Sequence, residues 1–371
     1  MNVLFLSDSL RSAKGGIGRV IEELSSSLRL AGIDIWVESP APLQTNRVDL
    51  VSNLVSIVPL VPGMMKAIHQ SPSIVHIHGY TSPYALLCAL MARIVGVPSV
   101  FNPNIHPHGN SPRFFRRSFD AVVGKMVFSL VDRVVVLTEV ERIIVMGLSS
   151  RIASKIVKIG NSLPRFVVSE PPTNAARRSP GTILFVGRLE PAKGIRELMN
   201  SLDLVLGANP HTSVVIATPG GTLLGEIHQW SSRWADRVEI RHAPSDDQLR
   251  TLYDSCWVLL IPSRYEAFGM VALEGLARGI PIVATDVGGL GMLLGKQERG
   301  LLVPPKNAAA LAQAVQKILD SEELHDRYGS PPHEFLQDFM PDKVAQAYVA
   351  VYRGLTCSDL SRDSRVSGRG L

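Results

Sequence analysis

A chain of 371 residues with 46% hydrophobic and 19% charged residues is long enough for two cores and too apolar for extensive disorder. Its net charge of +5 admits anionic partners, but no long run of basic residues interleaved with aromatic ones occurs, which argues against nucleic-acid binding. The three cysteines stand far apart without a CxxC pair, which excludes a disulfide framework and a zinc site and favours a reducing, cytoplasmic location.

The first half of the chain alternates short apolar runs with longer helix-like segments. Runs of strand length are Val3–Leu6, Ile33–Val37, Ile74–Ile77, Ser99–Phe101, Val134–Leu137 and Ile156–Ile159. Helices are expected between several of them, at Ile17–Leu30, Tyr84–Val95 and Phe115–Val131. Continuous β-branched runs separated by helices are typical of a parallel sheet covered on both faces, so we expect an α/β fold.

The second half repeats this alternation after a linker, predicted at residues 166–180 from their proline and charge content. Strands are expected at Thr182–Val186, Ser213–Ala217, Val238–Arg241, Trp257–Ile261 and Pro281–Ala284, and helices at Gly194–Leu206, Leu223–Trp234, Asp246–Asp254 and Met270–Arg278. The expected domains are therefore residues 1–165 and 181–335, with a disordered polar tail at 356–371. Ligands of such sheets bind beyond the carboxyl ends of the strands, which favours a site in a cleft between the two domains.

No segment has the pattern of a signal peptide or a membrane span. The apolar start MNVLFLSDSL is not preceded by a basic region. The stretch Leu50–Ile68 is interrupted by two prolines and a glycine, and Leu86–Val97 is too short and contains Arg93. We therefore expect no transmembrane helix.

Two acids interrupt an apolar strand–turn–helix passage, PSRYEAFGMVALEGLARGIPIV. Glu266 lies in the loop after the expected strand Trp257–Ile261, and Glu274 falls in the first turns of the next helix. A helix N-terminus attracts a diphosphate, whereas carboxylates accept hydrogen bonds from sugar hydroxyls, and a ligand that carries both groups is a nucleotide sugar. Taken singly, the two acids also fit a helix cap and a solvated helix residue.

The longer stretch PSRYEAFGMVALEGLARGIPIVATDVGG resembles the signature of the retaining family-4 glycosyltransferases of the GT-B fold. The spacing of its two acids, the Pro-Ser, the Phe-Gly, the Gly-x-Pro strand and the Val-Gly-Gly turn all agree. The resemblance implies two Rossmann-like domains that face a central cleft. It also implies that Glu266 contacts the sugar ring, that backbone N–H groups of Phe268, Gly269 and Met270 support it, and that Glu274 binds the ribose.

The segment FVGRLEPAKGI, which follows another expected strand, is similar to the family's loop with an Arg and a Lys. The resemblance implies that Arg188 and Lys193 hold the diphosphate and stabilise it as it leaves. An isolated pair of basic residues is otherwise most often surface charge. Both residues follow a strand end in the same half as the two acids, which favours the functional interpretation.

The segment SAKGGIGRVIEELSSSL resembles the family's first-domain loop that closes on the donor. Gly15 and Gly16 precede a helix, so their backbone can approach a phosphate or sugar closely. A plain loop glycine is an equally good interpretation of this motif. Lys14 is a further candidate for contact with the phosphates.

Histidines follow two expected strands of the first half. In VHIHGY, His76 has the position of a packing residue, and His78 at the strand end is expected to face the cleft. After the next strand, where the family often has a histidine, the sequence is FNPNIHPHGN. We take His106 as the catalytic candidate, with His108 and Asn104 as alternatives, because the register against the family pattern is ambiguous.

Two further segments concern the outer surface of the first half. FMPDKVAQAYVAVYRGL, at about residues 339–355, resembles the family's C-terminal helix that returns to the first domain. RFFRRSFDAVVGKMVFSL, Arg113 to Leu130, fits a helix with solvated arginines, or a face that contacts anionic lipid or a lipid-diphosphate acceptor. Peripheral contact with the inner face of a membrane therefore stays an alternative.

The resemblance implies a retaining hexosyltransferase that uses a nucleoside diphosphate sugar and a hydroxyl acceptor, a glycan or a lipid-linked glycan, in polysaccharide or glycolipid assembly. We expect no cofactor, and no metal because the sequence contains no DxD motif. Two other functions fit the same fold, a nucleotide-sugar epimerase and a non-catalytic nucleotide- or carbohydrate-binding protein. The joint presence of Arg188, Lys193, Glu266 and Glu274 favours the transferase.

Overall fold

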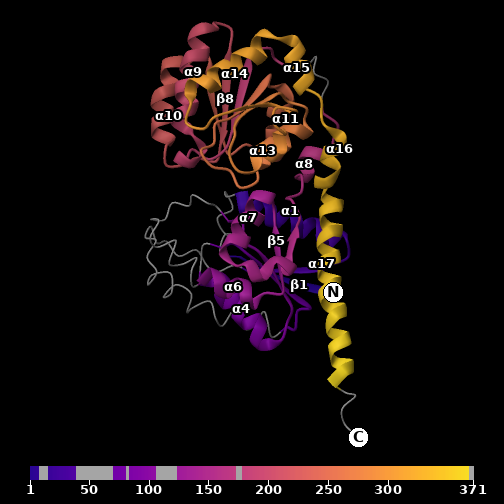
Figure 1. Cartoon of the computed structure of the whole chain (residues 1–371). Coiled ribbons are helices and arrows are strands. Elements are labelled where there is room, and N and C mark those ends of the chain that lie inside the picture. Colours follow the sequence, from indigo (N-terminus) through magenta and orange to yellow (C-terminus); the bar gives the residue numbers. More distant parts are fainter. Residues whose placement is uncertain (8–15, 39–69, 81–82, 106–122, 173–177, 367–371) are drawn as a thin grey trace. The chain divides into compact units, whose positions relative to one another are not determined.

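The structure is a computed structural model that describes residues 1–7, 16–38, 70–80, 83–105, 123–172 and 178–366. The chain divides into two compact units, unit 1 with Met1–Ser162 and Met340–Leu371, and unit 2 with Leu163–Phe339 (Figure 1). Each unit contains a six-stranded sheet in which all neighbours pair in parallel. The predicted α/β class with two Rossmann-like halves is confirmed.

The sheet of unit 1 has the strand order β2-β1-β3-β4-β5-β6. Its strands are β1 (Asn2–Ser7), β2 (Asp34–Glu38), β3 (Ile74–His78), β4 (Ser99–Asn102), β5 (Arg133–Val136) and β6 (Ile156–Lys158). The central strands are buried on both faces, which is why they are continuous apolar runs. The order changes direction between β1 and β3, so the carboxyl ends of these two strands form the switch point of unit 1.

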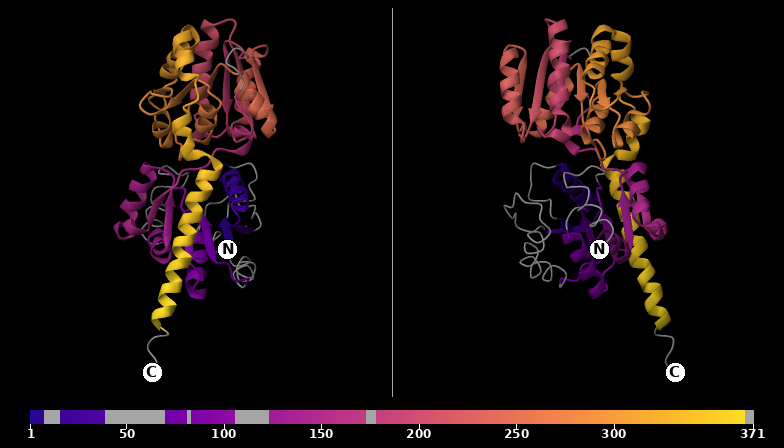
Figure 2. Two further views of the ribbon diagram at one scale, coloured as in Figure 1. Left: turned by 90° about the vertical axis from the view of Figure 1, so that its right-hand side faces the viewer. Right: turned by 60° about the vertical axis from the view of Figure 1, so that its left-hand side comes forward.

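Helices cover both faces of this sheet. They are α1 (Gly16–Leu30), α4 (Pro83–Val95), α6 (Lys125–Leu130), α7 (Glu139–Leu148) and α17 (Pro341–Val366). One core cluster joins α4 and α6 to the sheet, and the other joins α1 and α17 to its opposite face. Figure 2 shows α17 passing along unit 1 beside α1. The C-terminal helix predicted by resemblance is therefore part of unit 1.

Two expectations for unit 1 differ from the structure or lie outside it. The expected disordered tail from Thr356 is wrong in its first part, because α17 continues without a break to Val366. Of the expected helix Phe115–Val131, the structure describes only the end, which is α6. Across the described residues no helix is long and apolar enough to cross a membrane. The stretch Leu50–Ile68 lies outside them.

The sheet of unit 2 has the strand order β12-β11-β10-β7-β8-β9. Its strands are β7 (Thr182–Val186), β8 (Ser213–Thr218), β9 (Val238–His242), β10 (Val258–Ile261), β11 (Ile282–Thr285) and β12 (Leu301–Val303). From β7 the chain first builds outward through β8 and β9, and then returns to build the other side from β10. The switch point of unit 2 therefore lies between β7 and β10, where loops after both strands leave the same edge of the sheet.

Helices also cover both faces of the second sheet. They are α8 (Arg165–Val168), α9 (Ile195–Ala208), α10 (Leu224–Ser231), α11 (Asp246–Ser255), α12 (Met270–Ala277), α13 (Gly289–Leu294), α14 (Ala308–Asp320), α15 (Glu322–Tyr328) and α16 (His333–Leu336). One core cluster joins α9, α10 and α14 to alternate strand residues such as Val258 and Leu260. The helix α12 packs on the other face, where a Cβ at Gly275 would lie 2.5 Å from Leu259.

The described part of the predicted linker is tied into unit 2. Its first residues form the end of α8, and the guanidinium of Arg278, only 1% exposed, donates to the carbonyls of Val167 and Glu170 at 3.0 and 2.7 Å. A buried guanidinium requires such acceptors. The segment after Arg165 is therefore anchored to α12, which its proline-rich composition does not indicate.

Candidate functional site

Glu266 lies where the sequence predicts it, in the loop between β10 and α12. The loop ends at Gly269, which has the left-handed backbone φ of 99° and precedes the first residue of α12, Met270. A glycine adopts this conformation without strain, which explains the Phe-Gly of the motif. Gly269 is the N-cap and no side chain caps the helix, so the interpretation of Glu266 as a helix cap is wrong.

Lys193 and Glu266 form an ion pair across the switch point. The Nζ atom of Lys193 lies 2.6 Å from Oε2 of Glu266, and Ser263 Oγ donates to the same oxygen at 3.4 Å. The two charged side chains are 27% and 17% exposed, so both are accessible at the surface of the unit yet largely shielded. The structure thus brings together one cation and one acid that the sequence places 73 residues apart.

Backbone contacts hold these two loops against each other. The N–H groups of Arg264 and Tyr265 donate to the carbonyl of Ala192 at 2.9 and 3.3 Å. A Cβ at Gly194 would collide with the carbonyl of Pro262. The close approach requires glycine at residue 194, so the Lys193–Glu266 geometry is built into the loop backbones.

An ion pair reinforces the same junction. The guanidinium of Arg264 donates to both oxygens of Glu197, with distances of 2.6 to 3.1 Å, and joins the β10–α12 loop to the first turn of α9. Such a two-point bond fixes the relative orientation of the groups. Neither residue was singled out from the sequence, because a charged residue in a loop carries no local sign of its partner.

Arg188 lies in the loop after β7 but does not join this ion pair. Its side chain is exposed, and within the described ranges no hydrogen bond or ion pair engages its guanidinium. It is a free cation on the same loop as Lys193. An unpaired guanidinium at a switch point can bind an anionic ligand without first breaking an internal contact.

Glu274 is buried and hydrogen-bonded. It is the fifth residue of α12 and is 4% exposed. Its Oε2 accepts a hydrogen bond from the hydroxyl of Tyr253 at 2.6 Å. The interpretation of Glu274 as a solvated helix residue is therefore wrong. Tyr253 is fully buried in α11 and was not identified from the sequence, where it is an ordinary apolar position of a helix.

Two glycines press against the loop that carries Glu266. The N–H of Gly289 donates to the carbonyl of Glu266 at 3.2 Å. A Cβ at Gly288 would collide with that carbonyl, and a Cβ at Gly289 would collide with the carbonyl of Phe268. These are the glycines of the Val-Gly-Gly turn after β11. They pack against the segment 266–268, in which Phe268 is 2% exposed.

The loop after β8 supports the Arg188 loop in the same way. The N–H of Leu189 donates to the carbonyl of Gly220 at 3.0 Å, and a Cβ at Gly221 would lie 2.5 Å from the carbonyl oxygen of Leu189. The carboxyl group of Glu190 accepts bonds from the N–H and the hydroxyl of Thr222 at 3.2 and 2.8 Å. Four loops, those after β7, β8, β10 and β11, thus meet at the carboxyl edge of unit 2.

In unit 1, several predicted residues lie outside the described ones: Lys14, Gly15, His106 and His108. Gly16 is the first residue of α1. His78 ends β3 and is 3% exposed, and among the described residues its Nε2 has no hydrogen-bond partner. Burial, and to a smaller extent the neighbouring His76, hold the pKa of His78 well below its usual range, so this ring is neutral.

His76 belongs to a chain of buried hydrogen bonds that ties α17 to the sheet. Its Nε2 lies 2.9 Å from Asn102 Oδ1 and its Nδ1 lies 2.7 Å from Tyr352 Oη, while Asn102 Nδ2 donates to Tyr348 Oη at 2.6 Å. An amide oxygen only accepts, so Nε2 carries the proton and Nδ1 accepts the Tyr352 hydroxyl. Burial lowers the pKa of His76 to about 4, in agreement with this neutral tautomer.

Glu141, which the sequence did not indicate, holds the start of the loop that leads to His106. Its two oxygens accept the backbone N–H groups of Ile105 and Leu137, both at 2.7 Å. Burial raises the pKa of this carboxyl group to about 7 in spite of these bonds. Asn104, the alternative candidate beside it, has a left-handed φ of 51° and donates to the carbonyl of Asn102 at 3.4 Å.

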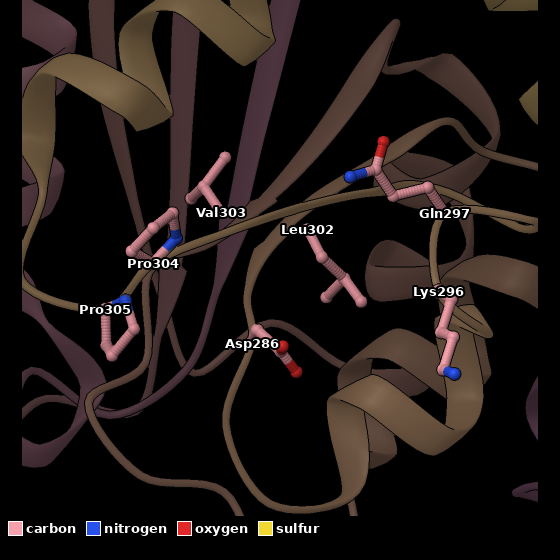
Figure 3. A pocket seen from close by; sticks show the side chains of 7 residues that line it. All are labelled: Asp286, Lys296, Gln297, Leu302, Val303, Pro304 and Pro305. Carbon is pink, nitrogen blue, oxygen red and sulfur yellow. The ribbon is translucent and has the colours of Figure 1, made fainter.

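A surface pocket of about 480 Å³ in unit 2 is lined by none of the predicted site residues. Its lining comes from Asp286 after β11, the turn Lys296–Gln297, and residues 302–305 of β12 and beyond (Figure 3). In the part of the chain that the structure describes, no three His, Cys, Asp or Glu side chains are grouped as metal ligands require.

Comparison with known proteins extends these observations. Glycogen synthase of Mycobacterium tuberculosis is 33% identical over 191 residues, which are 48% of this chain and 46% of that protein. D-inositol 3-phosphate glycosyltransferase of Streptomyces bingchenggensis is 31% identical over 179 residues, 46% of this chain and 39% of that protein. The chain matches less than half the length of these curated relatives.

Two solved structures resemble nearly the whole chain. Sucrose-phosphate synthase from Thermosynechococcus elongatus has a TM-score of 0.80 at 21% identity, over 96% of this chain and 100% of that one. HepE of Anabaena, in complex with UDP-glucose, has a TM-score of 0.74 at 19% identity, over 95% of this chain and 100% of that one. These likenesses confirm the predicted GT-B fold.

The family match falls on the unit that carries the ion pair. The family model described as glycosyl transferases group 1 matches residues 170–331. These residues include both loops of the switch point and the helices α11 and α12. Residues 170–331 of this chain are therefore similar to the glycosyl transferases group 1 family.

Proposed function

We propose that the chain is a retaining glycosyltransferase that moves a hexosyl unit from a nucleoside diphosphate sugar to a hydroxyl group of a glycan or lipid-linked glycan. The observation that carries this proposal is the Lys193–Glu266 ion pair at the switch point of unit 2, next to a helix with no side-chain cap. Ligands of such sheets bind at this place. The names of the similar proteins, which include a glycogen synthase and a structure bound to UDP-glucose, support the reaction class.

The cations of the β7–α9 loop are assigned to the leaving diphosphate. Arg188 is free to form two parallel bonds with phosphate oxygens, and Lys193 adds a second charge from the same loop. The first N–H groups of α12 and the partial positive charge of its N-terminus add to this field. Because these groups neutralise the charge that develops on the departing diphosphate, the proposed reaction needs no divalent metal.

The acids are assigned to the polyol parts of the donor. Glu266 is partly exposed and accepts hydrogen bonds, which suits a contact with sugar hydroxyls. Its ion pair with Lys193 keeps the carboxylate oriented before a ligand arrives, so less conformational entropy is lost on binding. Glu274, the fifth residue of α12, is assigned to the ribose hydroxyls.

The compartment assigned is the cytoplasm. Cys88, Cys256 and Cys357 are not joined in disulfide bonds, and the first two are buried. Free cysteines persist most readily in a reducing compartment. Fractionation of cells that produce the chain, with and without salt extraction of the membranes, would test this location and any peripheral membrane contact.

The test measures the rate of glycosyl transfer by two variants, and each variant has a matched control at the surface. The donor is first chosen by protection of the chain against heat unfolding by UDP-, GDP- and ADP-sugars. Arg188→Ala and Glu266→Ala are expected to lower turnover on the order of 100–1000-fold with the unfolding midpoint unchanged. Arg196→Ala and Glu226→Ala remove the same charges from an exposed ion pair of the same unit and are expected to keep full activity.

Product analysis without acceptor separates the transferase from an epimerase, since only an epimerase converts the donor sugar by itself. Near-normal transfer by both Arg188→Ala and Glu266→Ala would contradict the proposed roles. Addition of a chelator such as EDTA is expected to leave the rate unchanged. Dependence of the rate on an added divalent metal would contradict the assignment of the leaving-group charge to the two cations.

A further inference from the structure

Tyr253 is a fully buried residue whose hydroxyl points at a buried acid of the site. The Oη atom lies 2.6 Å from Glu274 Oε2, at the short end of the range for O–H···O bonds, where bonds from hydroxyls to carboxylates fall. The bond joins α11 to α12 across 21 residues of sequence. It therefore fixes the direction of one carboxyl group that the fold places near the switch point.

A second contact between the same helices fixes the place from which Tyr253 reaches Glu274. Asp254, the next residue of α11, accepts two bonds from Arg278, with distances of 2.6 and 2.7 Å. Arg278 follows Glu274 by one helix turn and is 1% exposed. Two consecutive residues of α11 therefore hold Glu274 of α12 and Arg278, the residue that caps the C-terminus of α12. The contact of Arg278 continues to hold the helices together when the Tyr253 hydroxyl is removed.

The N-terminus of α11 adds to this rigidity. Ser245 and Gln248 form a reciprocal capping box, in which each side chain accepts the backbone N–H of the other, at 3.3 and 2.9 Å. Such a cap holds the first turn of a helix in one conformation. The phenol of Tyr253 is thus carried by a helix that is fixed at both ends.

We propose that Tyr253 is a positioning residue, whose hydroxyl orients the Glu274 carboxyl group toward the 2′- and 3′-hydroxyls of the ribose and so makes the site selective for ribonucleoside diphosphates. The inference rests on the proposed function, in which Glu274 binds the ribose. A carboxylate has about four sites for hydrogen bonds, so one can be used for Tyr253 while others accept the vicinal hydroxyls. Without the Tyr253 hydroxyl, the Glu274 side chain becomes ordered only when the ligand binds, and this entropy cost weakens binding.

Tyr253→Phe tests this role because it removes one oxygen atom and keeps the packed ring. Tyr328→Phe is the matched control, since Tyr328 is a buried tyrosine of the same unit whose hydroxyl donates to the carbonyl of Gln297 at 3.2 Å. Calorimetric titration with UDP, GDP and ADP identifies the tightest nucleoside diphosphate for the unmodified chain. The same titration is then run with its 2′,3′-dideoxy counterpart.

The unmodified chain is expected to bind the dideoxy ligand at least about 10-fold more weakly than the ribose form. In Tyr253→Phe the affinity for the ribose form is expected to fall about 10-fold, and the affinity for the dideoxy form is expected to stay unchanged. Tyr328→Phe is expected to bind both ligands like the unmodified chain. In the Glu274→Gln background, Tyr253→Phe is expected to change the preference for ribose no further, because the effect acts through Glu274.

Two results would overturn the inference while the proposed function stands. One is Tyr253→Phe with unchanged affinities, and the other is equal weakening of the ribose and dideoxy ligands, which is the result of a structural role alone. A third result, no binding of any of the three nucleoside diphosphates to the unmodified chain, would overturn the proposed function and the inference together. The unmodified chain thus separates the two failures.

Discussion

At the switch point of unit 2 the structure places an ion pair between two partly exposed charges, whereas in β3, beside the switch point of unit 1, the two histidines are neutral and buried. Lys193 and Glu266 are 27% and 17% exposed, and water still contributes to their solvation. His76 has no exposed surface, and burial lowers its pKa to about 4. The loops after β7 and β10 therefore carry a charged pair, whereas His76 within β3 stays neutral.

The contrast shows how each unit avoids the cost of a buried charge. At the switch point of unit 2, Lys193 and Glu266 are paired and remain near the surface, where a ligand can reach them. In unit 1 the polar atoms satisfy one another in a chain from Tyr352 through His76 and Asn102 to Tyr348, so none of them needs a charge. We conclude that the first arrangement suits ligand binding and the second suits the attachment of α17.

Loss of the cation at the charged site is expected to give the largest effect. Lys193→Ala removes one of the groups that neutralise the leaving diphosphate and leaves Glu266 unpaired beside it. Steady-state transfer is expected to fall on the order of 100–1000-fold in kcat/KM. Lys317→Ala, an exposed lysine of α14, is the control. Activity of Lys193→Ala within about threefold of the unmodified chain would show that the pair has no part in the reaction.

At the neutral site the expected effect is on stability. His76→Ala leaves Asn102 Oδ1 and the Tyr352 hydroxyl without their partner and opens a cavity, so unit 1 is expected to lose roughly 3–5 kcal/mol. Hydrogen exchange of the amides in β3 and β4 measures this loss for unit 1 alone. His211→Ala, an exposed histidine, is expected to change less than about 0.5 kcal/mol. A similar small change in His76→Ala would mean that the chain of bonds is not required.

The pH dependence of stability sharpens the same contrast. The folded pKa of His76, about 4, is below the unfolded value of 6.5, so the unfolded state binds the proton more tightly. The contribution of the neutral His76 ring to the free energy of unfolding is therefore complete above about pH 6.5 and is lost as the pH falls toward 4. The whole contribution is about 3 kcal/mol. The free energy of unfolding of the unmodified chain minus that of His76→Gln, measured by urea titration from pH 7.5 to 4.5, should become smaller as the pH falls. A constant difference would contradict a buried neutral ring.

The smallest expected effect on stability comes from the loss of one hydrogen bond between neutral groups. Tyr348→Phe removes the acceptor of Asn102 Nδ2, a bond of 2.6 Å, and keeps the aromatic ring in the core. The expected loss is about 1 kcal/mol in unit 1, with transfer activity unchanged. The same hydrogen-exchange measurement reports it. A loss as large as that of His76→Ala would show that the bonds act as one unit and not singly.

Much of the fold follows from the pattern of apolar residues. The long central strands were predicted because a strand buried on both faces has to be a continuous apolar run, as in β7 and β10. No element was predicted between β11 and the C-terminal helix. The strand β12 has three residues that are mostly half-buried, and α13 contains glycines, so neither has a clear period. The helix α14, in contrast, has 13 residues with apolar ones at helical spacing, so the sequence indicates it and the prediction missed it.

The site was partly predictable for a different reason. Glu266 and Lys193 stand in loops directly after strands, and parallel strands bring such loops to one edge, so their meeting follows from the topology. The partner of Glu274 does not, because Tyr253 occupies an ordinary apolar position of its helix and its hydroxyl has a role only after α11 and α12 pack. Contacts between distant helices are a product of tertiary structure and leave no local mark in the sequence.

The attachment of α17 determines the order in which the units can be completed during synthesis. The strands that hold His76 and Asn102 leave the ribosome early, whereas Tyr348 and Tyr352, their buried partners, emerge only after all of unit 2. Nascent chains usually finish their first domain first. Here the second unit has all its residues available sooner, and the first must wait with an open face of its sheet until the last helix arrives.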